Sequence, residues 1–110
     1  MDKEKLNKIL VKMASNLEKN LSKSEFKRIK PIAEEIAKRH ASRLEWLEDM
    51  AKNSKIEKHQ YERALLSERD IYQIELQNIA KMSKYKAKKL AKIMGDTLRS
   101  TIFAAVEILF

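Results

Sequence analysis

The chain has 110 residues, is 44% hydrophobic and 36% charged, and carries a formal net charge of +8 at pH 7. This length and composition exclude a disordered chain and favour a single helical domain over residues 1–110. One glycine and one proline disfavour a turn-rich β protein, and the absence of cysteine excludes disulfides, thiolate metal sites and thiol catalysis.

Apolar runs are short throughout the sequence. No stretch reaches the ~18 to 20 apolar residues of a membrane span, and the first ten residues lack the apolar core of a secretory signal. We therefore expect a cytoplasmic protein.

The first predicted helix covers about residues 2–20. Its apolar residues follow spacings of four, three and four, which is the period of an α-helix with one buried face. These residues are Leu6, Leu10, Met13 and Leu17. Ser22 and Glu25 then have the spacing of a capping box, so a second helical segment is expected to begin there.

Pro31 lies inside this second segment. Proline has no backbone amide to donate and disfavours helical geometry at the preceding residue, so we expect a kink or break near residues 28–30. The main second helix is then predicted over about residues 31–52. Its stripe has a 4-3-4-3-4 spacing and consists of Ala33, Ala37, His40, Leu44, Leu47 and Ala51.

A polar break at residues 52–55 precedes the third predicted helix. Ser54 and Glu57 repeat the capping-box spacing, so this helix is expected to begin there and to continue through Met82. Ser67 resembles another cap but is interpreted as interior, because the apolar pattern around it is continuous.

The last segment has a long apolar pattern whose register differs from that of the preceding helix. The pattern consists of Ala87, Ala91, Met94, Leu98, Thr101, Ala105 and Ile108. Either Ser83 caps a separate helix, or one very long C-terminal helix passes through a stutter there. Gly95 lies inside the pattern and indicates close packing. The sequence as a whole predicts an all-α fold, a small bundle of three to four amphipathic helices.

His40 is the one polar residue on the stripe of the second helix. A metal site in a helical bundle uses converging Glu and Glu-x-x-His ligands, and the sequence has no Glu-x-x-His. We therefore expect a hydrogen-bonded structural histidine. The sequence motivates no catalytic residue, no metal ligand and no cofactor, so an enzyme is not expected.

A run of lysines forms the strongest local charge asymmetry, with no acidic residue between Glu75 and Asp96. These candidate contacts for an anion or a nucleic acid are Lys81, Lys84, Lys86, Lys88, Lys89 and Lys92. Such a field also attracts an acidic partner or an anionic membrane surface. The alternative interpretation is the solvated face of a core helix. Lysine suits loose phosphate contact, so any nucleic-acid binding is expected to be largely independent of base sequence.

The C-terminal residues 101–110 carry a single charge and are apolar around most of a helix circumference. They either fill the centre of the bundle or form a contact surface, and we expect the second. The predicted oligomer interface consists of Leu98, Ile102, Phe103, Ala105, Val106, Leu109 and Phe110.

Two functions follow from these features. The favoured hypothesis is a non-enzymatic helical interaction or structural module that acts as a homo-oligomer, most simply a dimer. The alternative is a lysine-driven nucleic-acid-binding accessory protein. Association with a membrane surface ranks below both.

Overall fold

The computed structural model describes residues 1–110 and contains helices only. The helices are α1 (Lys3–Glu18), α2 (Lys23–Arg39), α3 (Ala41–Lys52), α4 (Lys58–Ile79), α5 (Lys84–Thr101) and α6 (Ala104–Glu107). The predicted all-α bundle is thus confirmed, with six helices in place of three or four. None of the helices is both long enough and apolar enough to cross a lipid bilayer.

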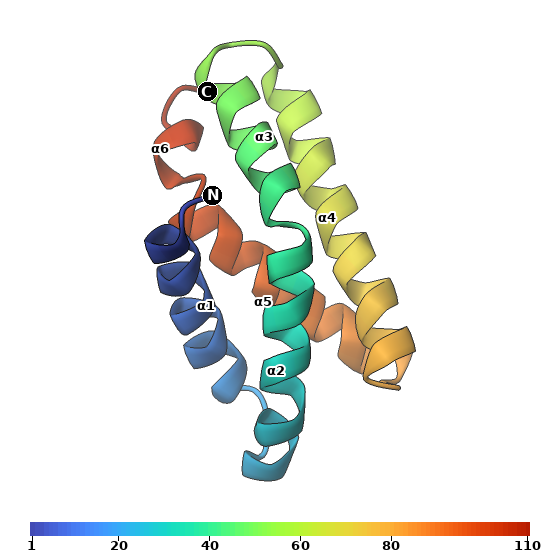
Figure 1. Ribbon diagram of the computed structural model, residues 1–110. Coiled ribbons are helices and arrows are strands. Elements are labelled where there is room, and N and C mark those ends of the chain that lie inside the picture. Colours follow the sequence, from blue (N-terminus) through green and yellow to red (C-terminus); the bar gives the residue numbers. More distant parts are fainter.

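The helices pack around α5. In Figure 1, α2 and α3 run end to end along the front, with α1 and α4 on either side and α5 crossing behind them. α5 packs most extensively against α4, then against α1, and its C-terminal end meets α6. One cluster of buried apolar side chains includes residues from all six helices.

The N-cap side chains of α1, α2 and α5 accept hydrogen bonds from backbone amides. The Asp2 carboxylate accepts a hydrogen bond from the Lys5 amide at 2.8 Å at the start of α1. The predicted capping box at α2 is confirmed: Ser22 Oγ accepts from the Glu25 amide, and Glu25 Oε1 accepts from the Ser22 amide.

The break in the second helical segment lies at His40, so the prediction of a break near residues 28–30 is wrong. Pro31 lies inside the continuous helix α2, where its ring is exposed. The carbonyl group that loses its amide partner belongs to Lys27, which is also exposed, so water can replace the missing hydrogen bond. His40 leaves helical geometry, with φ of −101° and ψ of 5°, and separates α2 from α3.

α4 is shorter than expected at both ends. It begins at Lys58, and Gln60 Oε1 accepts the Glu57 amide at 2.8 Å, whereas Ser54 takes a left-handed conformation with φ of 55°. The predicted capping box of Ser54 with Glu57 is therefore wrong. Ser67 is interior to α4, as predicted.

α5 is a separate helix capped by Ser83, which decides between the two interpretations of this junction. Ser83 Oγ accepts the Lys86 amide at 3.2 Å. α4 ends at Ile79, and Lys81 reverses the chain in a left-handed conformation with φ of 56°.

Gly95 lies where α5 crosses α4. A Cβ atom at Gly95 would approach Cγ of Arg69 on α4 to 2.5 Å, so the expectation of close packing at this glycine is confirmed.

Candidate functional site: the basic face of α5 and the C-terminal patch

The predicted lysine run lies on the turn before α5 and on α5 itself. The buried side of this helix carries Ala87, Leu90, Ala91, Met94, Gly95, Thr97 and Leu98. Lys88, Lys89 and Lys92 lie on the opposite side and are exposed. We call the exposed residues Lys81, Lys84, Tyr85, Lys88, Lys89 and Lys92 the basic face.

Two of the six predicted lysines have carboxylate partners. Lys86 is half-buried and forms an ion pair with Glu25 at the start of α2, so it holds α5 against α2. Lys92 Nζ lies 3.1 Å from Asp96 one turn along α5. Both members of that second pair are exposed, so water and salt screen it and the ammonium group can exchange partners at little cost.

The other four lysines have no carboxylate within ion-pair distance: Lys81, Lys84, Lys88 and Lys89. Asp96 is the only acidic residue on α5. The structure therefore gathers unneutralised positive charge at one end of the helix.

Tyr85 lies among these lysines and is 82% exposed. It is three residues from Lys88, four from Lys89 and seven from Lys92, which places all four on one side of α5. Its ring contacts no other aromatic ring, and its hydroxyl group forms no hydrogen bond within the chain. The fold therefore makes no use of this side chain.

α1 brings a second row of lysines to the edge of α5. The Asn16 side-chain amide donates to Thr97 Oγ1 at 2.9 Å and marks the seam between the two helices. Lys12 lies four residues before Asn16 on α1, and Lys19 lies three residues after it at the C-terminal cap of the helix, so both share the row of Asn16 and are exposed.

The predicted oligomer interface is divided by the fold. α5 ends at Thr101, so the helical pattern read from Ala87 through Ile108 does not form one straight helix, and the chain continues into the short helix α6. Four of the predicted interface residues are buried in the core of the same chain: Leu98, Ile102, Phe103 and Val106. The other three predicted interface residues are exposed: Ala105, Leu109 and Phe110.

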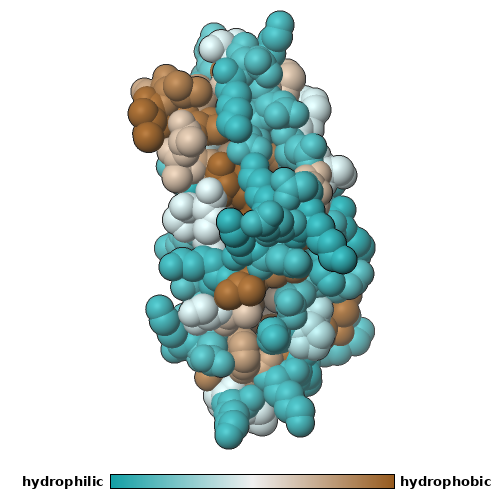
Figure 2. Space-filling model, turned by 60° about the vertical axis from the view of Figure 1, so that its left-hand side comes forward, coloured by the Kyte–Doolittle hydropathy of each residue, from teal (hydrophilic) through white to brown (hydrophobic).

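The exposed end of the tail forms a small apolar patch. Ile108, Leu109 and Phe110 are 84%, 61% and 40% exposed, and we call these three residues the C-terminal patch. Figure 2 shows an apolar cluster protruding at the upper end of the molecule, the end that carries α6 in Figure 1.

Glu107 on α6 fastens the tail to the bundle. Its Oε1 atom accepts from the Tyr61 hydroxyl at 3.2 Å and from Arg99 Nε at 2.9 Å. The Tyr61 ring lies 5.5 Å from Phe103 and 5.2 Å from Phe110, between ring centroids. Burial raises the pKa of the Tyr61 phenol, and the negative charge of Glu107 raises it further. The sequence alone does not predict these contacts of Glu107, because the apolar pattern of residues 101–110 favours one straight helix.

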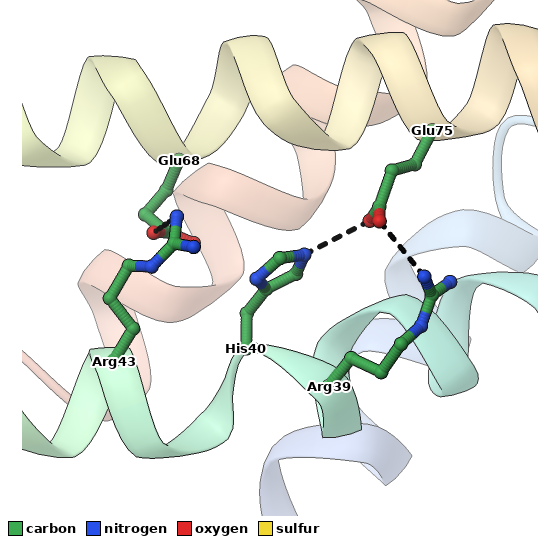
Figure 3. A network of polar contacts seen from close by, with 5 residues as sticks. All are labelled: Arg39, His40, Arg43, Glu68 and Glu75. Carbon is green, nitrogen blue, oxygen red and sulfur yellow. Dashed lines mark hydrogen bonds and ion pairs between the residues drawn. The ribbon is translucent and has the colours of Figure 1, made fainter.

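A polar network joins the α2–α3 junction to α4 (Figure 3). His40 Nε2 donates to Glu75 Oε2 at 3.0 Å, which confirms the predicted hydrogen bond, and Arg39 donates to the other oxygen of Glu75. Arg43 donates to buried Glu68 at 2.9 Å. The two arginines thus neutralise two carboxylates of α4, and His40 adds a hydrogen bond to one of them.

Burial raises the pKa of Tyr72, next to these groups, and the charge of Glu68 raises it further. No group of three or more His, Asp or Glu side chains comes together in a way that could hold a metal ion.

The largest hollow on the surface runs along the outer side of α1. It is lined mostly by lysine and other polar side chains around Val11, so it is a shallow feature of an exposed helix. It holds no buried polar group that could orient a substrate.

No family model matches the chain, and no similar curated protein or solved structure was found by comparison.

Proposed function

We propose that this protein is a non-enzymatic helical binding module whose basic face contacts the phosphate backbone of nucleic acid. The observation that carries this proposal is the set of four exposed lysines without carboxylate partners on α5 and the turn before it. A solvated face on an ordinary helix usually mixes both signs of charge. Here the two carboxylates that reach this part of α5 are already paired, Glu25 with Lys86 and Asp96 with Lys92, so the other four lysines keep their charge unneutralised.

The chemistry of lysine sets the kind of recognition. An ammonium group is a compact point charge that neutralises a phosphate without reading its geometry, whereas bidentate recognition of bases needs arginine or an amide side chain. Arg99 is the only arginine on α5, and it is occupied by Glu107. Binding should therefore be weak and independent of base sequence, with a dissociation constant on the order of 10⁻⁶ to 10⁻⁴ M.

Charge reversal on the basic face tests the proposal. We expect the double variant Lys88→Glu/Lys89→Glu to weaken binding of a labelled oligonucleotide by about tenfold or more at low salt, measured by fluorescence anisotropy. The slope of the logarithm of affinity against the logarithm of salt concentration should also decrease, by roughly 0.7 to 0.9 per lost phosphate contact.

The matched control is Lys38→Glu/Lys55→Glu, which lowers the net charge equally at exposed lysines of α2 and the α3–α4 loop. This control should retain most of the affinity. Equal losses in the two variants would show that net charge alone drives binding, and an unaffected Lys88→Glu/Lys89→Glu variant would exclude the basic face.

Self-association through the C-terminal patch is the second candidate. Its support is the exposure of Ile108, Leu109 and Phe110, and Ala105 on α6 is exposed as well. A stable dimer buries about 800 Å² per partner, more than a few side chains provide. The patch would therefore mediate a weak contact, and a homo-oligomer would depend on protein concentration.

A further inference from the structure

We infer that the basic face takes single-stranded nucleic acid, with Tyr85 as the platform on which a base stacks. This inference rests on the proposed function and adds to it the form of the nucleic acid. It begins from the one aromatic side chain that the fold leaves unused among the lysines.

Tyr85 has a position that suits stacking. Its ring is 82% exposed on α5, and Lys88 and Lys89 follow it by one turn on the same side. Every base has a π face that an aromatic ring can cover, and lysines beside the ring can hold the adjoining phosphates. A single strand offers both groups that this surface can bind: unpaired bases for the ring and phosphates for the lysines.

A duplex would use only part of this surface. The faces of its bases are covered by their neighbours, so the Tyr85 ring could reach only the backbone or a groove edge. The lysines would still neutralise phosphates, but the aromatic ring would add little. We therefore expect the preference for a single strand to depend on Tyr85 and the shared electrostatic attraction to depend on the lysines.

The length of the face limits how much strand it binds. Tyr85 and Lys92 are seven residues apart, which corresponds to about 10 Å along a helix. That length accommodates on the order of three phosphates at the spacing of one duplex strand. The salt dependence should therefore be shallow: the logarithm of affinity for a single strand should fall with the logarithm of salt concentration with a slope of about 2 in magnitude. Lys12 on α1 and Lys19 at its C-terminal cap offer further contacts to a longer strand.

The test compares Tyr85→Ala with Tyr85→Phe on oligothymidylate, oligouridylate and a duplex of equal length, at low salt. We expect Tyr85→Ala to weaken single-strand binding roughly fivefold or more, and to leave duplex binding and the salt slope unchanged. Tyr85→Phe keeps the ring and should bind as the wild type does. The two single strands separate DNA from RNA as the source of the unpaired bases.

Stacking also has a direct optical signature. Trp46 is the only tryptophan, and it lies on α3, away from the basic face. In a Trp46→Phe/Tyr85→Trp variant, the new indole fluorescence should be quenched when oligothymidylate binds. In the wild type, Trp46 fluorescence should not change.

The outcomes separate this inference from the proposed function. If no nucleic acid binds, the proposed function fails. If Tyr85→Ala binds single strands as well as Tyr85→Phe does, or if the wild type prefers the duplex, the stacking inference is overturned while the lysine-dependent function stands. Circular dichroism of each variant verifies that the exposed substitutions leave the helices intact.

Discussion

At the scale of single residues, the carboxylates of the polar network lie on the same side of α4 as its buried apolar residues. Glu68 and Glu75 are one heptad apart and fall in the same succession as Tyr61, Leu65 and Tyr72. A carboxylate on a buried stripe requires a charged or hydrogen-bonding partner from a neighbouring helix. That requirement can be inferred from the sequence, as can the need of His40 for a hydrogen-bond partner. The sequence does not show which helices face each other, because the spacing within one helix carries no information about its neighbours.

The two buried tyrosines give a residue-scale prediction. Burial raises the pKa of Tyr61 and of Tyr72 above the ordinary value of 10, because the charged phenolate is disfavoured there. The folded state therefore binds these protons more tightly than the unfolded state does. The resulting stabilisation is fully present below about pH 10 and is lost as the pH rises toward the folded-state pKa values.

The measurement uses a Tyr85→Phe variant, which leaves only Tyr61 and Tyr72 to ionise. Near-ultraviolet absorbance should show no phenolate until the helical circular dichroism signal falls, and then both should change together. Phenolate formation in a fully helical protein would contradict the burial of these rings.

At the scale of helices, sequence patterns located the starts better than the breaks. The caps at Ser22 and Ser83 are local, because a hydroxyl group satisfies an amide three residues away. The break at His40 left no trace in the periodicity, because the apolar spacing continues in register from α2 into α3. At Pro31 the reverse occurs: the sequence predicts a break, and the helix continues. The local penalty of the proline is real, but an exposed position lets water take the vacated carbonyl group.

Two serines allow the contribution of a helix cap to be measured: Ser83 caps the start of α5, and Ser67 lies inside α4. Ser83→Ala removes the hydroxyl that accepts the Lys86 amide and should lower the free energy of unfolding by about 1 kcal/mol. Ser67→Ala is the matched control, since Ser67 is exposed inside α4 and alanine has the higher helix propensity. Urea denaturation should show a lower midpoint for Ser83→Ala and an unchanged or higher one for Ser67→Ala. Equal midpoints for both variants would mean that the cap contributes nothing to α5.

At the scale of the whole molecule, composition and periodicity were sufficient for the all-α bundle, because every apolar pattern has a helical period. Composition and periodicity could not predict the path of the last ten residues. A pattern that is apolar on all sides fits both a helix at an interface and a tail folded into its own core. Long-range contacts decide between them here: Phe103 is buried against Tyr61, and Glu107 accepts hydrogen bonds from α4 and α5.

The tail divides into a buried and an exposed part, and substitutions in the two parts should differ in their effect on stability. Phe103→Ser removes a fully buried ring and should cost at least the ~3 to 5 kcal/mol of a Phe→Ala change, a large share of the ~5 to 15 kcal/mol that stabilises a typical domain. Ile108→Ser/Leu109→Ser alters only exposed side chains and should change the free energy of unfolding by about 0.5 kcal/mol or less. Thermal melting should therefore show a large drop for the first variant and almost none for the second.

Sedimentation of the same two variants examines self-association separately from folding. If the C-terminal patch mediates a weak contact, the wild type should shift from monomer toward dimer as its concentration rises, and Ile108→Ser/Leu109→Ser should stay monomeric at all concentrations. A wild type that remains monomeric throughout would remove self-association as a function and leave the basic face as the binding surface. A Phe103→Ser variant that melts like the wild type but loses its dimer would instead mean that Phe103 lies in an interface between chains, contrary to its burial in this fold.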